Sequence, residues 1–374
     1  MNVILYDRSS LATQLMSNFR KFYPNHMFWQ VMCDSDLPSE DWIKNNNIAL
    51  IVTTSLGPQL SLKFIKYARK LKNIGVQVFM PPENCVWLET SKVRTKKLLQ
   101  SLNIPTAEGF LLKGRNINSL PRPFVVKYLD EFNLLGRQTQ IVTDSFMLRT
   151  EHEEKDVLIE NFLIGNEFSY QVLCNGYDFV FFGISRDFKK YQNYNTTGVA
   201  AISECSQKPI PEINTYIKKI LLALRLLGTP YRGILYFNIM QVNNVYYILE
   251  INTRFGNPET QSLCSNIQSN LFAAFYLAAS GHKLFPIVSN GQTGVTVQLF
   301  HRNYDEHHKL YPKFPNITQI PPNIVFGFQN QWSRNNIFGS LTNCDTTVKQ
   351  SCTNIYSYLK NIDLGDYIYK DNLI

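Results

Sequence analysis

Short apolar runs alternate with longer amphipathic segments over the first part of the chain. The runs 3–6, 49–53 and 76–79 have the length of buried strands, and the segment 61–71 has a helical spacing of apolar positions. Strands that alternate with helices form parallel sheets, because a crossover is needed to bring the chain back in the same direction. Residues 1–80 are therefore predicted to form a βαβ lobe.

After Pro81–Pro82 the pattern changes and strands dominate. A basic helix is predicted from about Glu89 to Leu102, with Thr90 or Ser91 as its cap. Beyond it, short polar links join successive apolar runs, which is typical of an antiparallel α+β lobe. The strands predicted in this lobe are 124–127, 140–142, 157–160, 168–173 and 179–184.

A second strand-rich region follows an amphipathic helix predicted over 211–227. Residues 233–241 and 245–252 are predicted strands, and the pair Asn243–Asn244 between them favours a tight hairpin. The second strand of this hairpin leads into a polar stretch. A further helix is predicted over 262–280.

The whole chain is thus predicted to combine α/β and α+β architecture. The three predicted parts are an N-terminal substrate lobe over 1–80, a central domain over 81–285 with a mobile lid at about 110–185, and a small β-containing domain over 286–374. Two connecting segments are also predicted, a charged turn over 185–190 and a small-residue surface loop over 195–201.

The most informative chemistry lies at the end of the last hairpin strand. Successive side chains of an extended segment point to opposite faces, so Glu250, Asn252 and Arg254 are predicted to share one face. Mg²⁺ prefers oxygen ligands and keeps substrate phosphates in its shell, so these residues could form a metal-nucleotide site. Alternation alone fits a half-buried strand that enters a turn at 256–258 better.

Other segments favour the nucleotide interpretation. Lys92 could reach a phosphate from the start of a helix, or belong to a solvated basic face. Lys127 ends an apolar strand, where a lysine needs an anionic partner such as phosphate. Residues 160–163 could offer backbone groups to a base edge, and Glu167 could accept hydrogen bonds from ribose. The segment 130–139 is either a phosphate-covering hairpin or an ordinary turn.

Composition narrows the class of protein. The chain has 374 residues, of which 44% are apolar and 18% charged, so it is globular. Its net charge of +8 fits nucleotides or nucleic acid as ligands, and equally a basic surface that binds neither. Seven cysteines without a C-x-x-C pair, no signal-peptide pattern and no long apolar run indicate a cytoplasmic protein without a membrane partner. Motifs of P-loop, dinucleotide-binding and zinc-protease proteins are absent from the sequence.

Taken in order, these segments resemble the ATP-grasp superfamily and, within it, the phosphoribosylamine-glycine ligase (glycinamide ribonucleotide synthetase) family. The resemblance covers roughly residues 85 to 300. The segments that carry it are Leu88-Glu89-x-Ser91-Lys92, Val125-Val126-Lys127, Ile159-Glu160-Asn161-Phe162-Leu163-x-Gly165-x-Glu167, Asp187-x-Lys189 and Leu249-Glu250-x-Asn252-x-Arg254-Phe255-Gly256-x-Pro258-Glu259-Thr260-Gln261.

The resemblance implies a role for each matched residue. Mg²⁺ or Mn²⁺ would be held by Glu250 and Asn252, and the phosphoryl group in transfer would be stabilised by Arg254, Lys127 and Arg137. ATP would be bound by Lys92, Lys127, Glu160, Asn161, Phe162, Leu163, Glu167, Asp187 and Lys189. In such ligases ATP phosphorylates a carboxylate, and an amine then attacks the acyl phosphate to give an amide, ADP and phosphate.

The departures from the family pattern concern the substrates. A glycine-rich loop that meets the sugar phosphate in family members is replaced here by the residues 6–11, and the phosphate loop 132–138 keeps one glycine and has Arg137 for a lysine. Asn257 stands where relatives have aspartate. The candidate substrate residues are Arg8, Gly57, Pro58, Gly198 and Asn257.

Our leading hypothesis is an ATP- and Mg²⁺-dependent carboxylate-amine ligase, monomeric or homodimeric, with glycine as the favoured carboxylate and a changed amine acceptor. A modified nucleotide or a nucleic-acid base is one candidate acceptor, given the basic charge. One alternative is the authentic phosphoribosylamine-glycine ligase of purine synthesis. The other is a catalytically reduced protein that only binds nucleotide or nucleic acid.

Overall fold

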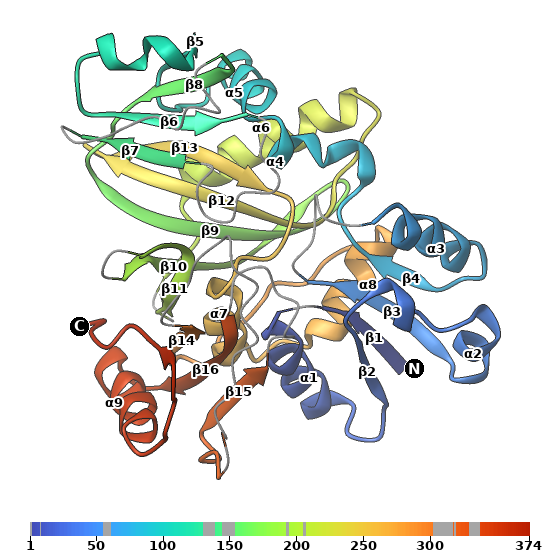
Figure 1. The fold of residues 1–374 in the computed structure, drawn as a ribbon. Helices are drawn as coiled ribbons and strands as arrows, with labels where there is room; N and C mark the ends of the chain where they lie inside the picture. The colour runs from blue at the N-terminus through green and yellow to red at the C-terminus, as the bar shows by residue number, and fades with distance from the viewer. Residues whose placement is uncertain are drawn as a thin grey trace.

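The computed structural model contains three sheets and a set of covering helices (Figure 1). It describes residues 2–7, 9–54, 61–129, 139–143, 154–191, 194–204, 207–301, 317, 319–328 and 337–374, without the side chains of 190–191 and 194–197. No helix within these ranges is long and apolar enough to cross a membrane.

The N-terminal lobe is a four-stranded parallel sheet in the order β2-β1-β3-β4, as predicted. Apolar side chains on both faces of its strands are covered by helices, which is why the strands read as continuous apolar runs. Its elements are β1 (Asn2–Tyr6), α1 (Leu11–Phe22), β2 (Phe28–Val31), η1 (Asp34–Asp36), α2 (Glu40–Asn45), β3 (Ile48–Thr53), α3 (Leu62–Asn73) and β4 (Gln77–Phe79).

A second, antiparallel sheet has the order β5-β8-β6-β7 and lies at the top of Figure 1. Its elements, with the helical segment before it, are η2 (Glu83–Cys85), α4 (Trp87–Thr90), α5 (Lys92–Ser101), β5 (Gly109–Lys113), η3 (Gly114–Ser119), β6 (Phe124–Tyr128), β7 (Thr139–Val142) and β8 (Asp156–Asn161). The basic helix predicted from Glu89 is in fact split at Ser91, whose side chain makes no capping hydrogen bond.

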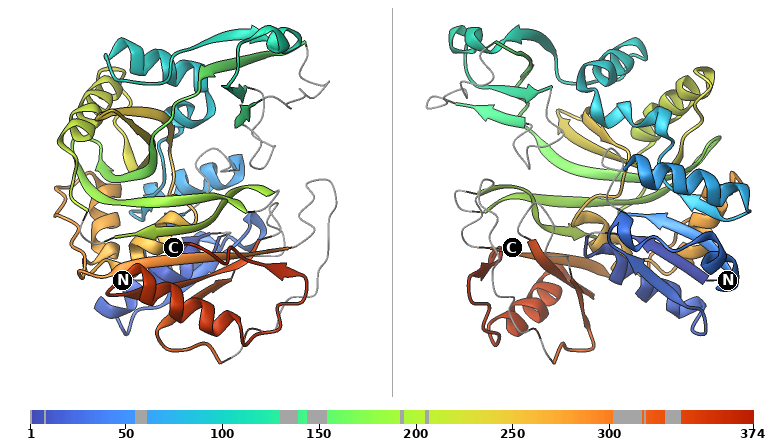
Figure 2. Two further views of the ribbon diagram at one scale, coloured as in Figure 1. Left: turned by 90° about the vertical axis from the view of Figure 1, so that its left-hand side faces the viewer. Right: turned by 45° about the vertical axis from the view of Figure 1, so that its right-hand side comes forward.

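The third sheet has nine strands and runs through the middle of the molecule into its C-terminal part (Figures 1 and 2). Its main order is β13-β12-β9-β10-β11-β14-β16-β15, and β17 pairs with β14. Its strands are β9 (Asn166–Asn175), β10 (Phe179–Tyr191), β11 (Tyr194–Ser203), β12 (Arg232–Val242), β13 (Val245–Asn252), β14 (Thr293–His301), β15 (Ile324–Phe328), β16 (Ile337–Asp345) and β17 (Tyr367–Ile368).

The connecting segments predicted at 185–190 and 195–201 were wrong, because both belong to strands of this sheet. Residues 185–188 continue the pairing of β10, and Val199, Ala200 and Ala201 are buried. The small and polar residues of 195–201 form a strand because β11 pairs with β10 on one side and β14 on the other, and α7 packs against it. Strand formation here depends on these neighbours more than on the residue types.

The remaining helices of the described residues are α6 (Pro211–Leu226), α7 (Glu259–Asn266), α8 (Leu271–Ser280) and α9 (Val348–Leu359). The single helix predicted over 262–280 was wrong, since Ile267 is extended and bridges to Ser289. The side chain of Asn270 then caps α8. The hairpin of β12 and β13 is confirmed, with positive φ at both asparagines of its turn.

Candidate active site

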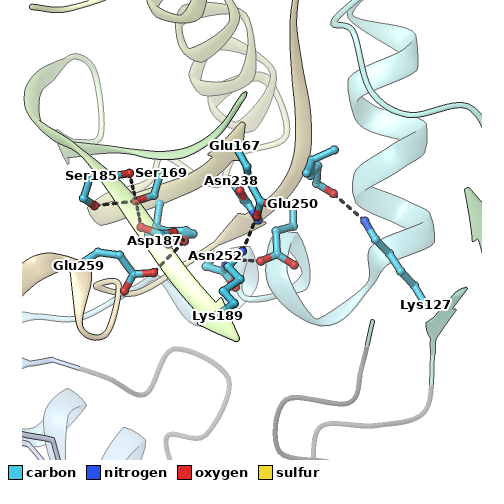
Figure 3. A network of polar contacts seen from close by, with 12 residues as sticks. Lys127, Glu167, Ser169, Ser185, Asp187, Lys189, Asn238, Glu250, Asn252 and Glu259 are labelled. Atoms are coloured by element: carbon cyan, nitrogen blue, oxygen red, sulfur yellow. Dashed lines mark hydrogen bonds and ion pairs between the residues drawn. The ribbon is translucent and has the colours of Figure 1, made fainter. Parts of the chain in front are cut away.

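One face of the nine-stranded sheet gathers the predicted polar residues. Glu250 pairs across the sheet with Asn238, Asn238 with Ser169, and Ser169 with Ser185. Side chains two residues apart on a strand point the same way, so Asn252 and Asp187 share this face. Figure 3 shows this cluster, with Lys127 approaching from the separate sheet that contains β6.

Glu250 and Asn252 lie side by side, with Asn252 Nδ2 3.4 Å from Glu250 Oε1 (Figure 3). Burial by itself raises the pKa of Glu250, but the ammonium groups of Lys189, Lys127 and Lys92 outweigh it and lower the pKa overall. Glu250 is therefore a carboxylate at neutral pH, beside an amide that also carries an oxygen. Two such ligands fit a divalent ion that completes its shell with phosphate and water oxygens.

Within the described residues, no group of three or more His, Cys, Asp or Glu could hold a metal by itself. That Glu250 and Asn252 bind a metal that enters with a nucleotide stays a prediction.

Lys189 and Glu167 form an ion pair of 2.6 Å beside the metal-ligand candidates. Glu167 Oε1 also accepts from Asn238 Nδ2 at 2.9 Å. Burial lowers the pKa of Lys189, but Glu167 and then Glu250 raise it by more, so the ammonium form is favoured. Glu167 and Lys189 therefore come together as a half-exposed pair, and their predicted roles toward nucleotide remain predictions.

Lys127 lies in a buried charge cluster that includes a residue the sequence analysis missed. Its Nζ is 2.7 Å from Glu160 Oε2 and donates to the carbonyl of Leu249 at 2.8 Å. The second lysine is Lys96, whose Nζ is 2.7 Å from Glu160 Oε1. Burial lowers the pKa of Lys96, although Glu160 opposes this. Lys127 thus has an anionic partner, as its burial requires, and that partner is the protein's own Glu160.

The remaining nucleotide candidates surround this cluster. Lys92 is the first residue of α5, and its Nζ donates to the carbonyl of Tyr128 at 3.4 Å. Asn161 ends β8, where its backbone N–H donates to the carbonyl of Glu108 at 2.9 Å. Phe162 and Leu163 follow in the half-buried link to β9. The structure thus places them at the junction of two sheets, and their contact with adenine stays a prediction.

Arg254 lies beyond the end of β13, so the predicted face extends only to Glu250 and Asn252. The chain bends there, and Arg254 Nε donates to Glu89 Oε1 at 2.9 Å. Glu89 Oε2 also accepts from the backbone N–H of Thr253 at 2.9 Å. The carboxylate of Glu89, from the short helix α4, therefore holds the bend in place.

Asp187, which is half-buried, and Glu259, which is buried, form an acidic pair beside Tyr236. The hydroxyl of Tyr236 lies 3.0 Å from Asp187 Oδ2 and 3.1 Å from Glu259 Oε1, and Ser169 Oγ donates to Asp187 Oδ1 at 3.0 Å. Burial, and then the neighbouring charge of Glu259, raise the pKa of Asp187 well above its usual range. Glu259 was not among the predicted site residues.

Asn257 is surrounded by amides at the other end of the site. Its Oδ1 accepts from Gln261 Nε2 at 2.6 Å and from Gln298 Nε2 at 2.9 Å. Both glutamines are buried, and their own Oε1 atoms have no hydrogen-bond partner within the described residues. A Cβ on Gly198 would lie 2.9 Å from the carbonyl oxygen of Asn257, so Gly198 packs directly against this residue.

Four predicted site residues, Arg8, Gly57, Pro58 and Arg137, lie outside the described residues. The missed residues Lys96, Gln261 and Gln298 are polar positions in buried elements, and Gln261 stands in the same polar run as Glu259. The only indication of these residues in the sequence was that each has a long polar side chain among apolar residues, where a buried polar group needs a hydrogen-bond partner.

Comparison with solved structures defines the class of fold. The phosphoribosylamine-glycine ligase of Thermotoga maritima matches with a TM-score of 0.76 and 21% identity, covering 99% of both chains. The biotin carboxylase of Campylobacter jejuni matches with a TM-score of 0.66 and 12% identity, covering 98% of this chain and 92% of that one. The protein therefore has the ATP-grasp fold, as predicted, with its N-terminal parallel sheet and its C-terminal strands.

Sequence comparison finds relatives of one kind. Residues 137–260 match the model described as phosphoribosylglycinamide synthetase, ATP-grasp (A) domain. The phosphoribosylamine-glycine ligase of Listeria monocytogenes is 26% identical over 362 residues, which is 88% of this chain and 85% of that protein. The chain is thus similar to phosphoribosylamine-glycine ligases over most of its length, at the low identity of a divergent relative. It is accordingly an ATP-grasp carbon-nitrogen ligase, from a class that forms amides, releases ADP and uses a divalent metal ion.

Proposed function

We propose that the protein joins an amino-acid carboxylate, with glycine favoured, to an amine other than phosphoribosylamine. The observation that carries this proposal is the environment of Asn257, where the resemblance places an aspartate. The ATP-grasp ligase class gives the type of reaction, and the side chain of Asn257 is the reason to propose a different amine acceptor.

The carboxamide of Asn257 presents a different surface from a carboxylate. Its oxygen accepts from the buried amides of Gln261 and Gln298, so the group left for a ligand is the Nδ2 donor. An aspartate in the same position would carry a negative charge and have only acceptors, which suits a substrate ammonium or hydroxyl. Exchanging an acceptor for a donor in a buried site discriminates strongly between substrates, because an unmatched polar group is costly.

The proposed reaction has two steps with balanced products. A carboxylate oxygen attacks the terminal phosphorus of ATP and ADP leaves, and the amine nitrogen then attacks the acyl carbon and displaces phosphate. The amide nitrogen loses one proton. A divalent ion bound by Glu250 and Asn252 would neutralise phosphate charge. Lys127 and Arg254 would contribute positive charge. The protein would act mainly by positioning the substrates and neutralising the charge of the phosphoryl group.

The direct test is ADP release by the purified protein with combinations of carboxylates and amines. We expect stimulation by glycine together with an amino sugar, an aminonucleoside or an amine-bearing nucleic acid, and little stimulation by phosphoribosylamine formed in situ. A Glu250→Gln variant should lose at least about a hundredfold in kcat/KM. Exposed Glu154 offers the matched control, and Glu154→Gln should leave the rate unchanged.

Two outcomes would contradict the proposal at different levels. Growth without purine of a bacterial strain that lacks its own phosphoribosylamine-glycine ligase, complemented by this gene, would show that the ancestral acceptor is still used. Absence of carboxylate-stimulated ADP release, together with DNA or RNA binding, would show instead that the protein is a non-catalytic binder.

A further inference from the structure

The carboxyl edge of the N-terminal sheet has the topology of a ligand site. Strand β1 has β2 on one side and β3 on the other, so the chain connections diverge at the ends of β1 and β3. Ligands of open parallel sheets bind at such a point, and a helix that starts there favours an anion through its free N–H groups. Helix α1 begins five residues after β1.

Asp7 fills this position with a carboxylate of the protein itself. It follows β1 directly, is fully buried, and accepts from the backbone N–H of Ala12 at 2.7 Å, in the first turn of α1. It also accepts from the backbone N–H of Ser9 at 2.9 Å and from its hydroxyl at 2.7 Å. The hydroxyl of Thr54, at the end of β3, is a further donor.

Three of these donors point to Asp7 Oδ1 and the fourth, the N–H of Ala12, to Oδ2. The N–H of Leu11 is taken by Ser9 Oγ at 3.2 Å. Among the described residues, the N–H groups of Leu11 and Ala12 at the start of α1 are therefore already used by Ser9 and by Asp7. An incoming phosphate would meet the carboxyl group of Asp7 at these two positions, and a negative charge on that group would repel it.

The turn before α1 also contacts elements outside the N-terminal lobe. Ser10 Oγ accepts from Gln261 Nε2 at 3.0 Å and from Ser340 Oγ at 2.7 Å. A Cβ on Gly327 would overlap the carbonyl oxygen of Ser10, so β15 packs closely on this turn, and Figure 1 shows α1 beside β15. The amide-lined surface around Asn257 adjoins the same serine through Gln261.

We infer that Asp7 is a specificity-determining residue, a buried carboxyl group that occupies the anion position and excludes phosphate, so that the amine acceptor approaches the carboxyl edge of the N-terminal sheet with an uncharged or cationic group. The inference rests on the proposed function and deepens it by naming the acceptor class, a non-phosphorylated amine. Asp7 acts by occupying the anion position and not by chemistry on the substrate.

The test is titration of the full chain with ribose 5-phosphate and with inorganic phosphate, while MgADP saturates the nucleotide site. We expect no saturable binding by the wild type up to about 10 mM, measured by calorimetry and by thermal shift. Asp7→Gly removes the charge and opens the space, and should lower the Kd at least about tenfold. Asp7→Asn removes the charge at nearly constant volume and should act in the same direction.

Asp41 is an exposed acid in the same lobe, and Asp41→Asn is the matched control that should not gain phosphate binding. Saturable wild-type binding of ribose 5-phosphate overturns the inference, and so do folded Asp7 variants that bind it no better. If neither variant folds, the wild-type titration decides. The titration needs no turnover, so failed ADP release would contradict the proposed ligase reaction without changing this result.

Discussion

At the scale of single residues, the site is held by charges that neutralise each other inside the protein. Glu160 is the partner of both Lys96 and Lys127, and all three side chains are more than 90% buried. Two ammonium groups facing one carboxylate leave one positive charge uncompensated within the trio. The ammonium group of Lys127 also lowers the pKa of Glu250, so that carboxylate supplies the second negative charge. The contact of Lys127 with phosphate stays a prediction.

Replacing Glu160 tests the trio. Glu160→Gln leaves two buried lysines without their carboxylate and should lower the free energy of unfolding by roughly 3–5 kcal/mol. The measurement is urea denaturation. Glu154→Gln is the control, because the Glu154 side chain is 75% exposed beside Arg115, and its effect should stay below about 0.5 kcal/mol. A Glu160→Gln variant as stable as the control would rule out this role for the carboxylate.

The acidic pair predicts a dependence of stability on pH. The pKa of Asp187 is raised in the folded protein, so above about pH 4 the unfolded chain releases this proton while the folded chain retains it. The contribution of Asp187 to stability therefore falls as pH rises toward its folded pKa. In Asp187→Asn this fall should be smaller, by about 1.4 kcal/mol for each pH unit that separates the folded from the unfolded pKa. The measurement is the free energy of unfolding of both proteins at acidic and alkaline pH. The same change of this free energy with pH in Asp187→Asn and in the wild type would contradict the prediction.

At the scale of elements, the contact of strand β11 with the turn before α7 places Asn257. Gly198 in β11 has a φ of +133°, and a Cβ there would lie 2.8 Å from Pro258 Cδ. Contacts this short force one of the two segments to move. Only glycine therefore allows β11 to approach the Asn257–Pro258 peptide so closely.

Gly198→Ala should displace Asn257 and lower kcat/KM for the amine by about tenfold or more, because small misplacements at a positioned site are costly. The control is Gly291→Ala, since Gly291 also has a positive φ but has no heavy atom within 4 Å of an added Cβ. Both variants bear backbone strain, and only the first bears the steric overlap. Equal kinetic losses in the two variants would show that the close approach is unimportant for the acceptor.

At the scale of the whole molecule, an aromatic cluster joins the N-terminal lobe to the central sheet. Phe79 of β4 stacks on Phe275 of α8 with ring centroids 4.7 Å apart, and Phe275 also contacts Phe255, directly after the site bend. Phe19 of α1 also contacts Phe275, with ring centroids 6.3 Å apart in an edge-on arrangement. One buried core therefore spans both parts, and the carboxyl edge of β1 is fixed relative to α7.

Truncating the centre of this cluster should loosen both parts together. Phe275→Ala should lower the free energy of unfolding by about 3–5 kcal/mol and shift a single thermal transition. Phe110→Ala, at a side chain on β5 that is 51% exposed, should have little effect. Two separate transitions in the Phe275→Ala variant would indicate that the lobes are not one cooperative unit.

Local patterns predicted most strands, the hairpin and the face shared by Glu250 and Asn252, because their periodicity and turn residues act over a few positions. They could not reveal the amides around Asn257, since Gln298 lies 41 residues away on β14. The break at Ile267 was missed because its cause is a bridge to Ser289, and Asp7 was missed because its donors come from two elements. Tertiary contacts decide such positions, and spacing along the chain does not encode them.

The nine-stranded sheet carries the candidate metal ligands on β13 and Gln298, which hydrogen-bonds to Asn257, on β14. Both ends of the site thus stand on one continuous ladder of backbone hydrogen bonds. A frame of this kind lets side chains at one end be exchanged in evolution while the other end keeps its geometry. New acceptors could therefore arise by point substitutions alone, with the phosphate chemistry inherited unchanged.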